Sequence, residues 1–212
     1  WRQRLAGRLG AEGRGGGRST GVEGGAGDAP YRPLFEERGG RYITRDLEGH
    51  PDVIIEPGSP LPFETASVDG VVSFQVLEHV WDAPGYLREC RRIVRKGGWM
   101  ILSTHGTWPY HPHPGDFRRW TREGIEREVQ AAVFVVERLF PLVGPPAWMA
   151  NFIQIKLWDR LLRSIPVLGL WILVPIGGFV YCAMAALDAI TPAGWRNDNA
   201  AIYLTLARAP AE

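Results

Sequence analysis

The sequence has little of three things that would point to a particular class of protein: net charge, cysteine and a secretory start. Its formal net charge is +1, so no global basic field attracts nucleic acid, which is excluded as a default partner. The two cysteines, Cys90 and Cys182, lack metal-ligand spacing and indicate ordinary buried thiols in a reduced, cytoplasmic setting. No secretory signal is present, and the start at Trp1 predicts that the chain is a fragment or a processed product.

What the chain does have is the composition of a globular protein, with 45% hydrophobic and 22% charged residues among 212. This length is enough for one large domain, or for a domain with an appendage. Residues 1–17 are rich in Gly and Arg and predict a flexible leader. We expect the core to span 18–140, an apolar helical insertion 141–199, and a terminal strand with a short tail 200–212.

The pattern of apolar residues predicts an α/β sandwich of three layers. Strand-like runs occupy 41–46, 52–56, 68–74, 100–104, 132–138 and 200–208. Residues 83–95 carry an apolar stripe at helical spacing, and Gly97-Gly98 then predicts the end of that helix. A strand, a helix and a strand of these lengths imply a right-handed parallel crossover.

Three short motifs in the same region resemble a known family. They are Leu61-Pro-Phe63, Leu77-Glu-His79 and Lys96-Gly-Gly98, and their order is similar to that in class I S-adenosylmethionine (SAM)-dependent methyltransferases of the type 11, small-molecule group. The resemblance implies a Rossmann-like fold with a mostly parallel seven-stranded sheet, its last strand antiparallel. It also implies S-adenosyl-L-methionine as the cofactor.

The resemblance assigns the cofactor to a glycine turn and an acidic residue. Glu23, Gly25 and Gly27 match the family's acid followed by Gly-x-Gly, and Asp46 ends a strand about twenty residues later, the spacing of a ribose-binding acid. The complete set of expected cofactor-binding residues is Glu23, Gly25, Gly27, Asp46, Leu47, Glu56 and Gln75. A nicotinamide-dependent oxidoreductase is disfavoured, because the sequence has no full G-x-G-x-x-G motif.

The acceptor side is predicted from histidines and aromatics. His105 follows a strand whose end faces the cofactor and is the first candidate for a catalytic base, with His79 as the second. For His79, a structural role and a catalytic role remain open. The expected acceptor pocket consists of Trp108, Tyr110, His111, His113, Asp116, Arg119 and Trp120, with Asp116 and Arg119 holding one another. Too few ligands are present in this loop for a metal site.

One segment has no place in the family pattern. Residues 148–163 predict an amphipathic helix, and residues 164–187 then contain no charged side chain. Pro175 interrupts the apolar run, so we expect two half-helices folded back as a hairpin rather than a membrane span. Such a hairpin fits three roles: contact with a membrane interface, a cover for the acceptor pocket, or a homodimer contact.

The sequence therefore predicts a SAM-dependent methyltransferase that acts on a small or lipid-linked acceptor. The expected location is the cytoplasm, with peripheral contact to the inner membrane face through residues 164–187. The first strand and the adenine loop depart from the family pattern. They motivate an alternative hypothesis, a catalytically silent protein of the same fold that serves as a membrane-associated or scaffolding module.

Overall fold

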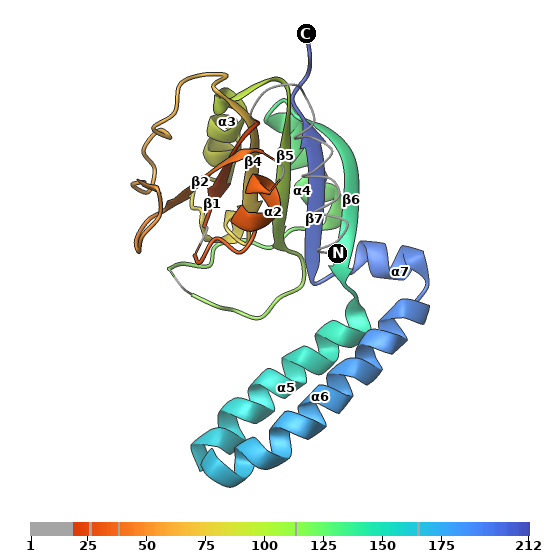
Figure 1. The fold of residues 1–212 in the computed structure, drawn as a ribbon. Helices are drawn as coiled ribbons and strands as arrows, with labels where there is room; N and C mark the ends of the chain where they lie inside the picture. Colours follow the sequence, from red (N-terminus) through yellow and green to blue (C-terminus); the bar gives the residue numbers. More distant parts are fainter. Residues whose placement is uncertain (1–18, 26, 38, 113, 165) are drawn as a thin grey trace.

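The computed structural model describes residues 19–25, 27–37, 39–112, 114–164 and 166–212, and these form an α/β domain with a projecting helical arm (Figure 1). The strands are β1 (Thr20–Gly24), β2 (Arg41–Asp46), β3 (Val53–Ile54), β4 (Val68–Phe74), β5 (Val94–His105), β6 (Val135–Val143) and β7 (Ile202–Arg208). The helices are α2 (Arg32–Glu36), the 3-10 turn η1 (Leu77–His79), α3 (Ala83–Ile93), α4 (Arg122–Ala131), α5 (Pro145–Ser164), α6 (Pro166–Ile190) and α7 (Ala193–Asp198). The predicted leader, residues 1–17, lies outside the described residues.

The strands form one seven-stranded sheet in the order β3-β2-β1-β4-β5-β7-β6. β7 is antiparallel to both of its neighbours, and the other pairs are parallel. This is the mostly parallel sheet with an antiparallel last strand that the sequence predicted. The chain moves outward from β1 to β3 and then crosses to the other side of β1 for β4. The carboxyl ends of β1 and β4 therefore flank a topological switch point, where ligands bind in open α/β sheets.

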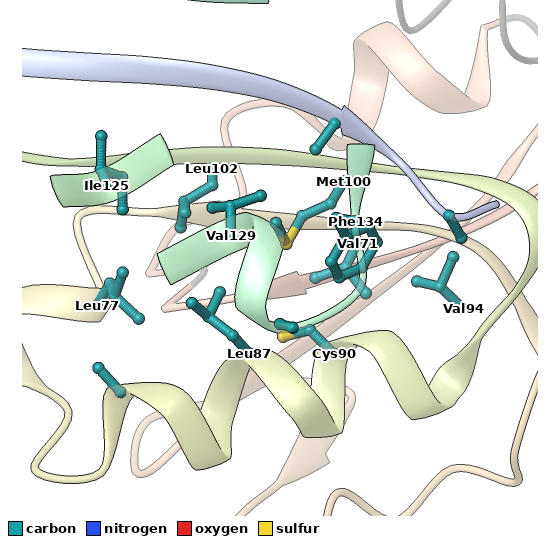
Figure 2. Close-up of a cluster of buried hydrophobic side chains, with 14 of the residues drawn as sticks. Val71, Leu77, Leu87, Cys90, Val94, Met100, Leu102, Ile125, Val129 and Phe134 are labelled. Carbon is teal, nitrogen blue, oxygen red and sulfur yellow. The ribbon is translucent and has the colours of Figure 1, made fainter. Parts of the chain in front are cut away.

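Apolar side chains cover both faces of the sheet. On one face, α3 and α4 bury Leu87, Ile93, Ile125 and Val129 against the central strands, and Figure 2 shows this cluster. On the other face, Phe35 of α2 belongs to a smaller cluster with residues of β2, β4, β5 and β7. The three layers thus consist of the sheet and the helices on its two faces, and each helix buries its apolar side against the sheet.

The predicted end of the helix after β4 was wrong. α3 ends at Ile93, and Val94 already has extended backbone angles and pairs with Val68 in the sheet. Gly97, with φ +69°, lies within β5 instead of capping the helix. Val94 is fully buried, and its β-branched side chain favours a strand over a helix. The helix therefore ends before it reaches the two glycines.

β1 is a central strand, although its sequence has little strand character. Gly24 ends the strand and pairs with Arg45 of β2 and Ser73 of β4. A Cβ at Gly24 would lie 2.9 Å from Nη2 of Arg45 and 3.1 Å from the hydroxyl of Tyr86. Glycine stands here because the buried guanidinium of Arg45, which donates to the Tyr86 hydroxyl over 2.9 Å, occupies the space of a larger side chain.

The segment between β6 and β7 forms an arm that we define as α5 together with α6. The predicted hairpin within residues 164–187 was wrong: α6 continues through Pro175, and its antiparallel partner is α5 (Figure 1). Proline lacks a backbone N–H and removes one hydrogen bond from a helix. The hydrogen bonds before and after it can still keep the helix continuous. Among the described residues, no helix is long and apolar enough to cross a membrane.

Candidate functional site

The candidate residues gather at the carboxyl ends of the parallel strands. Gly25 and Gly27 follow β1, Asp46 ends β2, Gln75 follows β4, and His105 ends β5. Because parallel strands end at the same edge of a sheet, residues far apart in the sequence meet here.

The turn after β1 requires glycine. Gly25 and Gly27 have φ values of +64° and +48°, in the left-handed region that glycine adopts without strain. A Cβ at Gly25 would lie 2.4 Å from Cγ2 of Val76, in the loop after β4. The loop after β4 therefore packs directly against the backbone of this turn.

The glycine turn and the acid of β2 lie together. The Gly27 N–H donates to Oδ2 of Asp46 over 3.4 Å, and the Leu47 N–H donates to Oδ1 over 2.8 Å. The Asp46 carboxylate is partly accessible at the sheet edge. The structure thus brings together the two groups that the sequence spacing linked, while their role in holding a cofactor stays a prediction.

Two further acids of the predicted set differ in their surroundings. Glu23 of β1 is 2% exposed, and burial raises the pKa of its carboxyl to about 7, with the Asp46 carboxylate acting in the same direction. Glu56 is exposed in the turn after β3. Among the described residues, the structure shows no contact between the Glu56 side chain and the glycine turn.

Gln75 connects this edge to a cavity. It has φ +54°, and its N–H donates to the carbonyl oxygen of Ser103 over 3.0 Å. Its Nε2 donates to the Ser103 hydroxyl over 2.9 Å. A cavity of about 510 Å³ opens here, large enough for a small organic molecule. It is lined by Tyr31, Phe74, Gln75, Ser103, His105, Trp108, His111, Leu142, Ile202 and Leu204.

His105 lies in the wall of this cavity and contacts a buried acid. Its Nδ1 is 3.1 Å from Oε1 of Glu78, and both side chains are almost fully buried. Oε2 of Glu78 accepts a hydrogen bond from the Thr104 hydroxyl over 2.8 Å. The imidazole also stacks on the Trp108 ring, with centroids 4.9 Å apart.

Burial sets the charge states of this pair. It lowers the pKa of His105 to about 3, and the Arg119 guanidinium acts in the same direction. Burial also raises the pKa of Glu78. At neutral pH His105 is therefore an uncharged imidazole.

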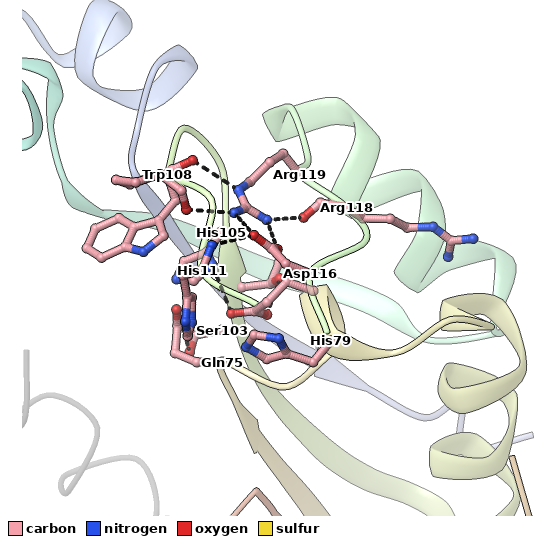
Figure 3. A network of polar contacts seen from close by, with 12 residues as sticks. Gln75, His79, Ser103, His105, Trp108, His111, Asp116, Arg118 and Arg119 are labelled. Carbon is pink, nitrogen blue, oxygen red and sulfur yellow. Dashed lines mark hydrogen bonds and ion pairs between the residues drawn. The ribbon is translucent and has the colours of Figure 1, made fainter. Parts of the chain in front are cut away.

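The loop after β5 is held by an ion pair (Figure 3). Asp116 and Arg119 form the predicted pair, with Nη2 of Arg119 2.6 Å from Oδ2, and this lowers the pKa of Asp116 to about 2. Arg119 also donates to the carbonyl oxygens of Trp108 and Pro109, over 3.2 and 2.9 Å. The Asp116 carboxylate accepts the N–H of His111 over 2.9 Å. Side-chain bonds to backbone thus fix the loop over the cavity.

The other predicted residues of this loop take different positions. Trp108 and His111 line the cavity, whereas Tyr110 is exposed and Trp120 is buried in the main core cluster. The backbone N–H of Trp120 donates to the carbonyl oxygen of His105, which joins this part of the loop to the end of β5. His113 lies outside the described residues. Within the described part of the chain, no cluster of three His, Cys, Asp or Glu side chains could hold a metal.

His79 contacts the loop and is not itself one of the residues that line the cavity. Its Nδ1 donates to the carbonyl oxygen of Gly115, and its ring meets that of His111 edge to face at 4.8 Å. These contacts favour the structural alternative for His79. The pairing of Glu78 with His105 was not predicted, because nothing local in the sequence links two residues so far apart along the chain.

The comparisons with known proteins agree on one family. The family model described as "Methyltransferase domain" matches residues 23–102. A probable S-adenosylmethionine-dependent methyltransferase of Mycolicibacterium smegmatis is 35% identical over 102 residues, which is 43% of this chain and 40% of that protein. A probable methyltransferase of the same kind from Mycobacterium tuberculosis strain H37Rv is 46% identical over 52 residues, or 24% of this chain and 19% of that protein. These matches thus span less than half of the relatives.

The fold is also shared with solved structures. The 1,6-didemethyltoxoflavin-N1-methyltransferase of Burkholderia thailandensis, solved with 1,6-didemethyltoxoflavin and S-adenosylhomocysteine bound, has a TM-score of 0.60 at 15% identity. The alignment covers 98% of this chain and 77% of that chain. At this identity the likeness concerns the fold.

Proposed function

We propose that this chain, whose residues 23–102 match the family model described as "Methyltransferase domain", transfers a methyl group from SAM to a small acceptor in the cavity beside His105. The observation that supports this most is the convergence of the glycine turn and Asp46. Their backbone N–H and carboxylate are 3.4 Å apart at the switch point of the sheet. SAM supplies a methyl group already activated by the sulfonium charge.

The residues present fit this cofactor. The Asp46 carboxylate, partly accessible and already oriented by two backbone N–H groups, is suited to accept hydrogen bonds from ribose hydroxyls. The turn at Gly25 and Gly27 has backbone angles that would strain other residues. Without side chains, its backbone can come close to the amino acid portion of SAM. Gln75, fixed by Ser103 at the cavity wall, offers a side-chain amide between the two regions.

His105 is suited to take a proton from the acceptor. Methyl transfer to a hydroxyl or amine leaves a proton that a neutral imidazole can accept. The buried Glu78 carboxyl lies next to Nδ1 of His105, and stacking on Trp108 limits rotation of the ring. The loop fixed by Asp116 and Arg119 contributes Trp108 and His111 to the wall of this region.

Calorimetric titration with SAM and with S-adenosylhomocysteine tests the cofactor assignment. Asp46→Ala should weaken binding by about 1.5–3 kcal/mol, roughly ten- to hundredfold, because a charged hydrogen-bond acceptor is lost. Glu48→Ala, two positions further along the chain and exposed, is the matched control and should bind like the parent.

Two results would contradict the proposal. Equal affinity of the Asp46→Ala variant and the parent would mean that the acid of β2 does not hold the ribose. Failure of the folded parent to bind either molecule at millimolar concentration would leave only the catalytically silent alternative.

A further inference from the structure

The arm exposes apolar side chains that nothing in the described chain covers. α6 packs on α5 closely at Gly177, where a Cβ would lie 2.1 Å from Nε2 of Gln154 and 2.8 Å from Cζ2 of Trp158. Away from this contact the helix is open, with Phe179 76% and Ile190 78% exposed. Large exposed apolar patches of this kind mark interaction sites.

The exposed apolar residues do not lie on one stripe. Phe179 and Tyr181 are both exposed, although two successive steps of about 100° place them on nearly opposite sides of a helix. On α5, Ile153 and Leu157 are also exposed. A second copy of the chain would cover one side of the arm, whereas the headgroup and acyl boundary of a bilayer can cover apolar side chains on several sides of it.

The charges in the sequence of the arm complement an anionic lipid surface. No charged residue occurs between 166 and 187, and the sequence of α5 contains Lys156, Arg160 and Arg163 against Asp159 alone. Apolar helices flanked by basic residues bind at the interface of anionic bilayers, with the basic groups at the headgroups. With Asp188 of α6 included, the sequence of the arm has three basic residues and two acidic ones, and this excess of positive charge favours an anionic surface.

The arm is joined to the rim of the cavity. Leu142, which lines the cavity, is three residues before α5, and Ile202, which also lines it, begins β7 after the arm returns. The N–H of Ala201 donates to the carbonyl oxygen of Val143 over 2.8 Å, so both ends of the arm meet at this point. The base of the arm therefore lies next to the rim of the cavity.

We propose that the α5–α6 arm docks the protein on the surface of an anionic lipid bilayer. The arm lies in the interface without crossing the hydrocarbon, and it brings the rim of the cavity to the lipid surface. Resting on the proposed function, this docking makes a lipid-linked acceptor the substrate class that reaches His105.

Flotation with liposomes tests the docking. The parent should float with vesicles of phosphatidylcholine containing about 30% phosphatidylglycerol, and less with phosphatidylcholine alone. The double variant Ile176→Glu with Phe179→Glu, both at exposed positions of α6, should float about tenfold less, because two acids replace apolar side chains in the interface. Val135→Glu, an exposed position at the start of β6, is the matched control and should float like the parent.

The outcomes separate this inference from the proposed function. Circular dichroism and SAM affinity of the double variant should equal those of the parent, which shows that the fold and the cofactor site are intact. A parent that stays at the bottom of the gradient, or a double variant that floats equally, overturns the docking proposal. The docking proposal is also overturned if the parent is a dimer that does not float and the double variant is a monomer. In that case the exposed side chains of the arm bind a second copy of the chain. If the parent floats with the vesicles but does not bind SAM, only the methyltransferase proposal is refuted.

Discussion

At the scale of single residues, His105 shows what sequence reasoning reached and what it missed. Its position after an apolar strand predicted a group at the cofactor edge, and the structure places it in the cavity wall. The buried Glu78 beside it was assigned only to a motif, because the 3.1 Å contact between the two depends on how η1 packs against β5. Local patterns predict which strand end a residue occupies but not which side chain it meets there.

Replacing His105 tests its role as a base. His105→Asn should lower kcat about 10²–10⁴-fold, with SAM affinity unchanged, because the proton acceptor is removed. The pKa of His105 is about 3, so its neutral form persists as pH falls and the rate should show no loss near the ordinary histidine pKa of about 6.5. The measurement is release of S-adenosylhomocysteine with any acceptor that the parent methylates, followed over pH.

His50→Asn is the matched control for this experiment. His50 is exposed in the loop after β2, and its replacement should leave kcat unchanged. If His105→Asn keeps the parental kcat, the acceptor loses its proton elsewhere, to solvent or to another group.

At the scale of elements, helices and strands with strong periodicity were predicted well and the arm was not. β2 and β4 coincide with their predicted ranges of 41–46 and 68–74, because β-branched and aromatic residues in these runs favour strands. The apolar run 164–187 was divided at Pro175, yet α6 continues through it. The reason is tertiary: packing on α5 at Gly177 supports the helix where local propensity would end it.

The joint between β6 and α6 gives a prediction at this scale. The Asp188 carboxylate accepts the N–H of Gly144 over 2.5 Å, and this contact fixes α6 to the end of the sheet. Asp188→Ala should lower the free energy of unfolding by about 1–3 kcal/mol, because a partly buried N–H loses its acceptor. Urea denaturation followed by circular dichroism measures the change.

Asp198→Ala provides the comparison for Asp188. The Asp198 carboxylate is 63% exposed and lies 3.8 Å from Arg122, so its loss should cost less than about 1 kcal/mol. Equal effects of the two substitutions would show that the Gly144 contact adds nothing to the joint.

At the scale of the whole molecule, the sequence predicted a mostly parallel sheet with an antiparallel last strand, but it did not predict the order of the strands or the direction of the arm. Alternating strands and helices, together with the family resemblance, predicted the mostly parallel sheet that the structure has. Nothing in the residues of the arm predicts that it leaves the domain instead of folding over the cavity (Figure 1). That direction depends on how β6 ends and on the Asp188 joint, which are contacts between distant segments.

The stability of the whole molecule should depend on pH through Glu23. Its pKa rises from 4.5 in the unfolded chain to about 7 in the fold, so the folded state binds the proton more tightly. This contribution to stability is complete below about pH 4.5 and is lost as pH rises to about 7, by up to about 3 kcal/mol. Glu23→Gln lacks this loss, so its free energy of unfolding relative to the parent should rise between about pH 5 and pH 8.

Denaturant unfolding of both proteins at the two pH values measures this difference. Glu37→Gln, at an exposed position after α2, is the control, and its offset from the parent should stay the same at both pH values. A pH-independent offset for Glu23→Gln would show that the Glu23 carboxyl ionises in the fold as it does in the unfolded chain.

The hydrogen bond between Ala201 and Val143 closes the base of the arm and makes it a self-contained excursion from the sheet. Since the chain returns to the point it left, an excursion of another length or composition could be exchanged between β6 and β7 without altering how the strands pair. The arm and the cavity can therefore change independently in evolution, because replacing one does not require replacing the other.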